Sequence, residues 1–238
     1  MKLSRRNLPG GFTLIEFMVV LAVLVLLAAM LLPGMNGNKA KPERILCTNN
    51  LKQVGLAYRE WATDHNDNHP PEVSLTNGGA MEAVLAGDVA MVFRVLSNQI
   101  STPKILFCPT DRRRIQATTF DNIPVKRSRR DVPFVGNSNV TYFVGLDTNP
   151  SSFQMLLTGD DNLLVGGQAG YYGGLNGSPV RPGLLSLWTN TPVAWADSRH
   201  GKQGNVGLAD GSVQWFSSRK LAEALCNTGA TTNRLAFP

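Results

Sequence analysis

An apolar run of 22 residues lies close to the amino terminus, at residues 12–33, and a single charged side chain, Glu16, interrupts it. The run reads FTLIEFMVVLAVLVLLAAMLLP. As an α-helix rising 1.5 Å per residue, it would be about 33 Å long, which is enough to cross the hydrocarbon core of a membrane. The pattern therefore predicts a transmembrane helix.

The charges on either side of this run predict its orientation. Lys2, Arg5 and Arg6 precede it, and few charges follow before Lys39, so the short amino-terminal tail is expected in the cytoplasm and the rest of the chain outside. A secretory signal peptide would end in a small-residue cleavage site, whereas this run ends in Leu-Leu-Pro-Gly at residues 31–34. A signal peptide is therefore disfavoured.

Glu16 is the residue that a plain membrane anchor does not explain, because an ionisable side chain inside the membrane costs about 2.5 to 3.5 kcal/mol. Cleavage between Gly11 and Phe12 would create a positive α-amino group on Phe12, which the Glu16 of a neighbouring subunit can neutralise when apolar helices pack together. Four residues, about 6 Å of helix, separate the two groups, so an internal pair can also form before assembly. The alternative is a glutamate near a helix end whose carboxylate reaches the membrane surface.

The segment GFTLIE at residues 11–16, after a basic leader and before the apolar run, resembles the type IV prepilin cleavage and methylation motif. The resemblance implies that a prepilin peptidase cuts after Gly11 and N-methylates Phe12, that Glu16 is the assembly glutamate, and that Pro33 with Gly34 marks a kink. It implies an inner-membrane protein with a cytoplasmic amino terminus and a periplasmic head, which later joins a periplasmic or cell-surface fibre. The implied partners are membrane lipid before assembly, other pilin or pseudopilin subunits in a homo- or hetero-polymer, and an assembly platform with its ATPase.

Helical periodicity returns after the apolar run. Residues 39–64 place Ile45, Leu51, Val54, Tyr58 and Trp61 on one stripe, which predicts a helix that packs on a sheet. The turn-forming sequence DHNDNHPP at residues 64–71 ends it. A second helix is expected over 79–97, although Gly87 interrupts its pattern.

The remainder predicts an antiparallel sheet. The strongest hairpin signal is Asp210-Gly211, expected as a two-residue turn between strands 206–209 and 212–216. The other predicted strands are 104–107 (with 108 at its end), 140–146, 153–157, 184–188 and 193–196, with a short helix at 221–225. The expected fold class is α+β, a pilin-like lollipop with a long amino-terminal helix packed on an antiparallel β-sheet head. The expected domains are a leader at 1–11, the transmembrane and polymerisation helix at 12–33, and the head at 34–238.

Motifs in the head carry a second resemblance. Three motifs resemble the large pilin-like proteins of the DUF1559-like, type II secretion protein G-like group: residues 47–53 (CTNNLKQ), residues 107–111 (FCPTD), and His200 separated by nine residues from Asp210-Gly211. That group has a carboxy-terminal H-x9-DG domain, which would occupy about residues 193–217 here.

Three cysteines, Cys47, Cys108 and Cys226, leave one unpaired under any disulfide scheme. A Cys47–Cys108 bridge is the preferred pairing, because it would tie the end of the long helix to the segment before residue 108. Closing that loop would stabilise the fold by about 4 kcal/mol. The alternative is three separate buried thiols.

Two pairs of residues are candidates for metal binding. His200 and Asp210 are candidates for metal binding or a subunit contact, but a turn already explains Asp210. Asp160 and Asp161 offer the hard oxygen ligands of calcium, and G-type pseudopilins as a family use a calcium loop. The residues here lack calcium-loop spacing, so a plain turn is favoured. No cofactor is expected, although calcium is a candidate.

Charge defines the alternative function. The net charge of +6 falls to +3 (6 − 3) when the three leader cations are removed. The remaining basic residues gather in one stretch, Arg112, Arg113, Arg114, Lys126, Arg127, Arg129 and Arg130. They favour a solvated loop over a site for nucleic acid or another acidic polymer.

Two function classes therefore remain, a fibre subunit and a membrane-anchored surface protein whose basic segment binds an acidic polymer. An enzyme is not expected. Asp197, Ser198 and His200 are adjacent in the chain without a G-x-S-x-G elbow, and P-loop and Rossmann patterns are absent from the sequence.

Overall fold

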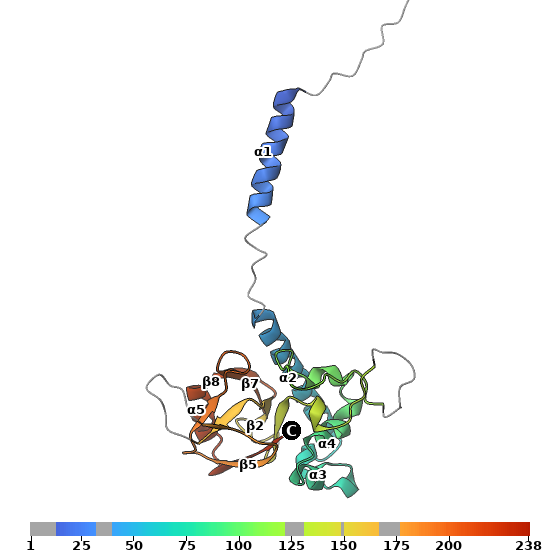
Figure 1. The fold of residues 1–238 in the computed structure, drawn as a ribbon. Helices are drawn as coiled ribbons and strands as arrows, with labels where there is room; N and C mark the ends of the chain where they lie inside the picture. The colour runs from blue at the N-terminus through green and yellow to red at the C-terminus, as the bar shows by residue number, and fades with distance from the viewer. Residues whose placement is uncertain (1–12, 32–39, 122–130, 149, 167–176) are drawn as a thin grey trace, which may run out of the picture. The chain divides into compact units, whose positions relative to one another are not determined.

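The chain divides into two units, Met1–Lys39 and Ala40–Pro238. The computed structural model describes residues 13–31, 40–121, 131–148, 150–166 and 177–238 (Figure 1).

The first unit contributes one helix, α1 (Leu14–Leu31), with the sequence LIEFMVVLAVLVLLAAML. Its described large apolar side chains are between 44% and 79% exposed. Within the described ranges, no helix meets the length and apolarity needed to cross a membrane, so the predicted transmembrane helix over 12–33 is not confirmed.

The second unit, the head, is built on a six-stranded sheet in the order β5-β9-β1-β2-β7-β8, in which every neighbouring pair is antiparallel. A three-stranded antiparallel sheet has the order β4-β3-β6. The strands are β1 (Tyr142–Gly145), β2 (Leu156–Asp160), β3 (Leu163–Val165), β4 (Ser178–Pro179), β5 (Gly183–Trp188), β6 (Val193–Trp195), β7 (Gln203–Leu208), β8 (Val213–Ser217) and β9 (Thr232–Phe237). The α+β class with an antiparallel sheet is confirmed.

Helix α2 (Ala40–Thr63) packs on this sheet against β2, β7 and β8. Its buried stripe repeats at intervals of four and three residues and consists of Cys47, Leu51, Val54, Tyr58 and Trp61. The helix and its packing are confirmed, but the placement of Ile45 on the stripe is wrong, because that side chain is 60% exposed. Cys47 takes its place.

Two predicted elements differ in the structure. The expected strand at 104–107 is wrong: Pro103–Leu106 forms a 3₁₀ helix, η5, which Pro103 starts and the Thr102 hydroxyl caps by accepting from the Lys104 N–H. The helix expected over 79–97 is divided into α3 (Met81–Leu85) and α4 (Val89–Val95). Gly87 has a φ of +93° between them.

The remaining helices are short. Helix α5 (Ser218–Asn227) begins at the Ser217 cap and confirms the helix predicted near the carboxyl terminus. The other 3₁₀ helices are η2 (Pro70–Glu72), η3 (Leu75–Asn77), η4 (Leu96–Asn98) and η6 (Asn137–Asn139). Figure 1 shows α3 and α4 at one side of the head and α5 at the other.

The head has two main apolar clusters. The first includes Tyr58 and Trp61 of α2 with Phe93 of α4, and the second includes Trp195 of β6 and Phe237 of β9. A third, smaller cluster joins Cys47, Leu51, Cys108 and Tyr142. This smaller cluster adjoins the polar groups described next.

Candidate functional site

The amino terminus of α1 is closed by a capping box. Thr13 precedes the helix, and its N–H and hydroxyl both donate to Oε2 of Glu16, at 2.8 and 2.7 Å. The Glu16 N–H donates in return to the Thr13 hydroxyl at 3.4 Å. This is the reciprocal arrangement of the T-x-x-E sequence at a helix start, so within the described residues the carboxylate is held by its own first turn.

The other predicted processing residues, Gly11 and Phe12, lie outside the described residues, as do Pro33 and Gly34. The pairing of Glu16 with the amino group of Phe12 therefore stays a prediction.

Four reactive side chains meet inside the head. They come from four separate segments: Cys47 from α2, Cys108 from the loop after η5, Asp160 from the end of β2, and His200 from the loop before β7. One ligand-type atom from each lies within 4.8 Å of the others. The Cys47 thiol donates to the Cys108 sulfur at 2.7 Å, and Nε2 of His200 lies 3.3 Å from that same sulfur and 3.6 Å from Oδ2 of Asp160.

This group, here called the thiol centre (Cys47, Cys108, Asp160 and His200), is closed to solvent. The first three residues are 0% exposed and His200 is 8% exposed. His200 has a φ of +49°, a backbone conformation that is rare for a residue with a Cβ. Gly201 and Lys202, which follow it, also have positive φ values, of +61° and +58°.

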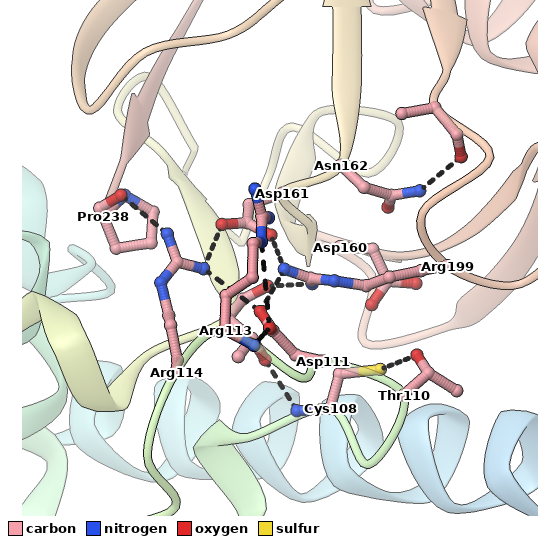
Figure 2. Close-up of polar contacts among 12 residues, drawn as sticks. Cys108, Thr110, Asp111, Arg113, Arg114, Asp160, Asp161, Asn162, Arg199 and Pro238 are labelled. Carbon is pink, nitrogen blue, oxygen red and sulfur yellow. Dashed lines mark hydrogen bonds and ion pairs between the residues drawn. The ribbon is translucent and has the colours of Figure 1, made fainter.

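A buried ion-pair network lies beside the thiol centre (Figure 2). The Arg199 guanidinium lies 2.5 Å from both Asp111 and Asp161 and donates to the carbonyl of Thr141 at 3.0 Å. Arg114 pairs with Asp161 as well and donates to the Pro238 carbonyl at 2.8 Å. Two guanidinium groups that are mostly buried thus face two buried carboxylates, and the largely exposed Arg113 lies 3.9 Å from Asp111 as well.

Burial and proximity shift the protonation of the thiol centre. The hydrogen bond from Cys47 and the neighbouring His200 lower the pKa of Cys108, while the same hydrogen bond and burial raise the pKa of Cys47. Burial raises the pKa of Asp160. Burial alone would lower the pKa of His200, but its hydrogen bond to Cys108 and the charge of Asp160 raise it.

The two calcium candidates, Asp160 and Asp161, lie in different surroundings. Asp161 belongs to the ion-pair network, where Arg114 and Arg199 occupy its carboxylate. Oδ2 of Asp160 accepts from the Asn205 backbone and side chain at 2.8 and 3.0 Å, among sulfur and nitrogen atoms. Calcium prefers an all-oxygen shell, so this environment does not favour it.

The structure brings together the two cysteines of the predicted disulfide, although their sulfurs are free thiols 2.7 Å apart. Cys226 is exposed and its thiol donates to the Thr189 carbonyl. The bridge itself stays a prediction.

The H-x9-DG spacing is the length of one strand. His200 precedes β7 and Asp210-Gly211 follow it, so about 20 Å of strand separates them. The Leu208 N–H donates to the Ser212 carbonyl at 2.8 Å, so the loop that this bond closes has three residues, 209–211, instead of the expected two. The Gly211 N–H donates to the Leu208 carbonyl, and Gly211 has a φ of +82°. Arg59 of α2 donates to the Asp210 carbonyl, so the Asp-Gly loop docks the hairpin on α2.

The basic segment is only partly described. Lys126, Arg127, Arg129 and Arg130 lie outside the described residues. Arg114 is committed to the internal network, whereas Arg113 keeps 68% of its side chain exposed. The acidic-polymer site stays a prediction.

Sequence reasoning missed three features of these sites. The T-x-x-E pattern at residues 13–16 was available as a capping-box signal. The four-and-three spacing of residues 47, 51, 54, 58 and 61 would have placed Cys47 on the buried face. Nothing local indicated that Arg199 and Asp111, which are 88 residues apart, would pair.

Comparisons with known proteins bear on the first unit. Residues 6–32 match the family model described as the prokaryotic N-terminal methylation motif. The match supports a type IV pilin-like prepilin. Neither the curated proteins nor the solved structures gave a match to the chain.

Proposed function

We propose that this chain is a pilin or pseudopilin subunit that is cleaved after Gly11, N-methylated at Phe12 and assembled through α1 into a type IV pilus-like or type II secretion fibre. The observation that carries the proposal is Glu16 in the first turn of an apolar helix, inside the methylation motif matched at residues 6–32.

The apolar side chains of α1 need an environment that the described part of the first unit does not supply. Side chains from Leu14 to Leu27 are exposed around the whole helix. Transfer of such surface out of water is strongly favourable. Membrane lipid before assembly, and the α1 helices of neighbouring subunits after it, would bury this surface.

The charge of Glu16 favours a helix that assembles with other subunits over a plain membrane anchor. Residues 13–31 contain no Lys, Arg or His, so the Thr13 cap supplies hydrogen bonds to Glu16 but no compensating cation. Cleavage after Gly11 would create that cation at Phe12. An ion pair between one subunit's Phe12 and the next subunit's Glu16 would then set the axial offset between subunits.

The finer assignment, to the DUF1559-like, protein G-like branch with an H-x9-DG domain, belongs to the same proposal. It is supported by the meeting of Cys47, Cys108 and His200 in one centre and by the docking of the Asp210-Gly211 loop on α2. We propose an inner-membrane location with a periplasmic head, processing by a prepilin peptidase, and polymerisation by an assembly platform whose ATPase supplies the energy. The chain itself is proposed to have no enzymatic role.

The processing step is tested by intact-mass analysis and amino-terminal sequencing of the chain, expressed with and without a prepilin peptidase. We expect a mature chain that begins at methylated Phe12 only when the peptidase is present. A chain that keeps Met1 in peptidase-competent cells, or one that begins after residue 33, would overturn the proposal.

The assembly step is tested by separating the charge of Glu16 from its capping role. Glu16→Gln keeps an oxygen that accepts from the Thr13 N–H but removes the charge, whereas Glu16→Ala removes both. Thr13→Ala removes the capping hydroxyl, at a cost of about 1 kcal/mol, and keeps the charge. We expect both Glu16 variants to be cleaved yet absent from sheared fibres, and Thr13→Ala to assemble. Normal assembly of Glu16→Gln would refute the ion-pair role.

A further inference from the structure

The thiol centre contains the donor types of a transition-metal site. Cys47, Cys108, Asp160 and His200 contribute two sulfurs, a carboxylate and an imidazole from four separate segments. All four residues are buried, and burying this many ionisable groups is costly unless they are paired or bind a metal.

The geometry argues against a catalytic triad. In a Cys-His-Asp triad, the carboxylate binds the ring nitrogen opposite the one that faces the nucleophile. Here the Cys108 sulfur and Asp160 Oδ2 both approach the same ring nitrogen, Nε2 of His200, at 3.3 and 3.6 Å. Donor atoms that converge on one buried point, which a substrate cannot reach, are typical of a set of metal ligands.

Asp160 provides an independent observation. Its Oδ2 accepts both hydrogen bonds from Asn205, while its Oδ1 is buried and has no hydrogen-bond partner among the described residues. A buried carboxylate oxygen without a partner costs about 1–3 kcal/mol or more, and a bound cation would supply the missing interaction.

The donor set selects the ion. Two thiolates, one imidazole and one carboxylate match Zn²⁺, whereas calcium and magnesium require oxygen ligands. We propose that Cys47, Cys108, Asp160 and His200 bind a structural Zn²⁺ ion.

A dication with two thiolates and one carboxylate carries a net charge of −1, whereas the same three anionic groups without a metal would carry −3. Arg199 does not supply this compensation, because its guanidinium already pairs with Asp111 and Asp161. Outer contacts orient the ligands: the Thr110 hydroxyl lies 2.9 Å from the Cys108 sulfur, and Asn205 holds Asp160.

Binding would change the centre in a defined way. Two thiolates at about 2.3 Å from a tetrahedral ion lie about 3.8 Å apart, so the sulfurs must separate from their present 2.7 Å. Four protein ligands leave no open position, which is characteristic of structural zinc. The ion would join α2, the loop after η5, β2 and the loop before β7, and it would stabilise the folded head.

The test uses the full-length chain purified in mild detergent without reductant or chelator. We expect one zinc ion per chain by elemental analysis. Exchange into Co²⁺ should give the thiolate-to-cobalt charge-transfer band and the visible bands of a tetrahedral site. Cys47→Ser, Cys108→Ser and His200→Asn should lose the metal and these bands, while the matched control Cys226→Ser, at the exposed cysteine, should keep both.

Two outcomes would overturn the proposal. One is a Cys47–Cys108 disulfide without bound metal, found by alkylation and mass spectrometry under non-reducing conditions. The other is a metal content that stays unchanged in the Cys47 and Cys108 variants, or that falls as much in Cys226→Ser as in those two variants. If a variant fails to fold, the Co²⁺ spectrum of the unaltered chain decides. Cleavage after Gly11 is measured separately, so failure here leaves the fibre proposal standing.

Discussion

Replacing Arg199 by methionine tests whether the buried ion-pair network holds the head together. The Arg199 side chain is 1% exposed, lies 2.5 Å from both Asp111 and Asp161, and also donates to the Thr141 carbonyl. Methionine preserves much of the side-chain length but leaves the two buried carboxylates with Arg114 and the largely exposed Arg113 as their cations.

The magnitude follows from burial. Removing one partner of a buried ion pair costs about 3–5 kcal/mol, because the remaining charge stays desolvated without compensation. Arg234 supplies the matched control, since it also pairs with a carboxylate, that of Asp147, but is 53% exposed. Exposed pairs contribute about 0–1 kcal/mol, so Arg234→Met should have a small effect.

The assay is urea unfolding of the full-length chain in mild detergent, followed by tryptophan fluorescence. All four tryptophans lie in the head and none in α1, so the signal reports the head. We expect the free energy of unfolding to fall by about 3–5 kcal/mol in Arg199→Met. Asp111→Asn should lower the free energy of unfolding less in the Arg199→Met variant than in the unaltered chain, because there it removes a carboxylate that has lost its cation. Equal losses in the Arg199 and Arg234 variants would refute the reasoning.

Two further predictions concern other parts of the head. Burial lowers the pKa of His69 to about 4, so the folded state binds fewer protons than the unfolded state; stability should be full above pH 6.5 and fall by up to about 3 kcal/mol as the pH drops toward 4. Urea titrations at several pH values should show a smaller loss for His69→Gln, and equal pH slopes would contradict this origin. A Cβ on Gly204 would lie 2.5 Å from the buried Trp195 ring, so Gly204→Ala should lower the unfolding free energy by about 1–3 kcal/mol. Gly136→Ala is the control: no atom lies within 4 Å of its new Cβ, so the free energy of unfolding should change by less than about 0.5 kcal/mol. Similar thermal midpoints for the two variants would contradict the steric argument.

Local patterns predicted much of the fold correctly. The 3.6-residue period identified α2 to within one residue at each end, and the Asp-Gly pair located the β7–β8 hairpin. Both features arise from neighbours in the chain, which periodicity and turn chemistry report directly.

Errors occurred where tertiary packing outweighed local propensity. Residues 104–107 are apolar enough for a strand, yet the cap at Thr102 and the constraint of Pro103 favour a 3₁₀ turn. Strand β9 was not predicted, because apolar and polar residues do not alternate fully in its sequence, TNRLAF. The segment forms a strand because it pairs with both β5 and β1. A central position in a sheet depends on which strands become its neighbours.

The amino-terminal motif, the apolar run and the position of Glu16 are contiguous, so the order of residues alone carried the methylation motif and the prediction of a fibre subunit. The thiol centre and the Arg199 network depend on residues far apart in the chain, such as Cys108 with His200, 92 positions apart, and Asp111 with Arg199, 88 positions apart. Strand order and helix docking bring these groups together. No local pattern encodes that proximity, because it results from the packing of the whole head around its sheet.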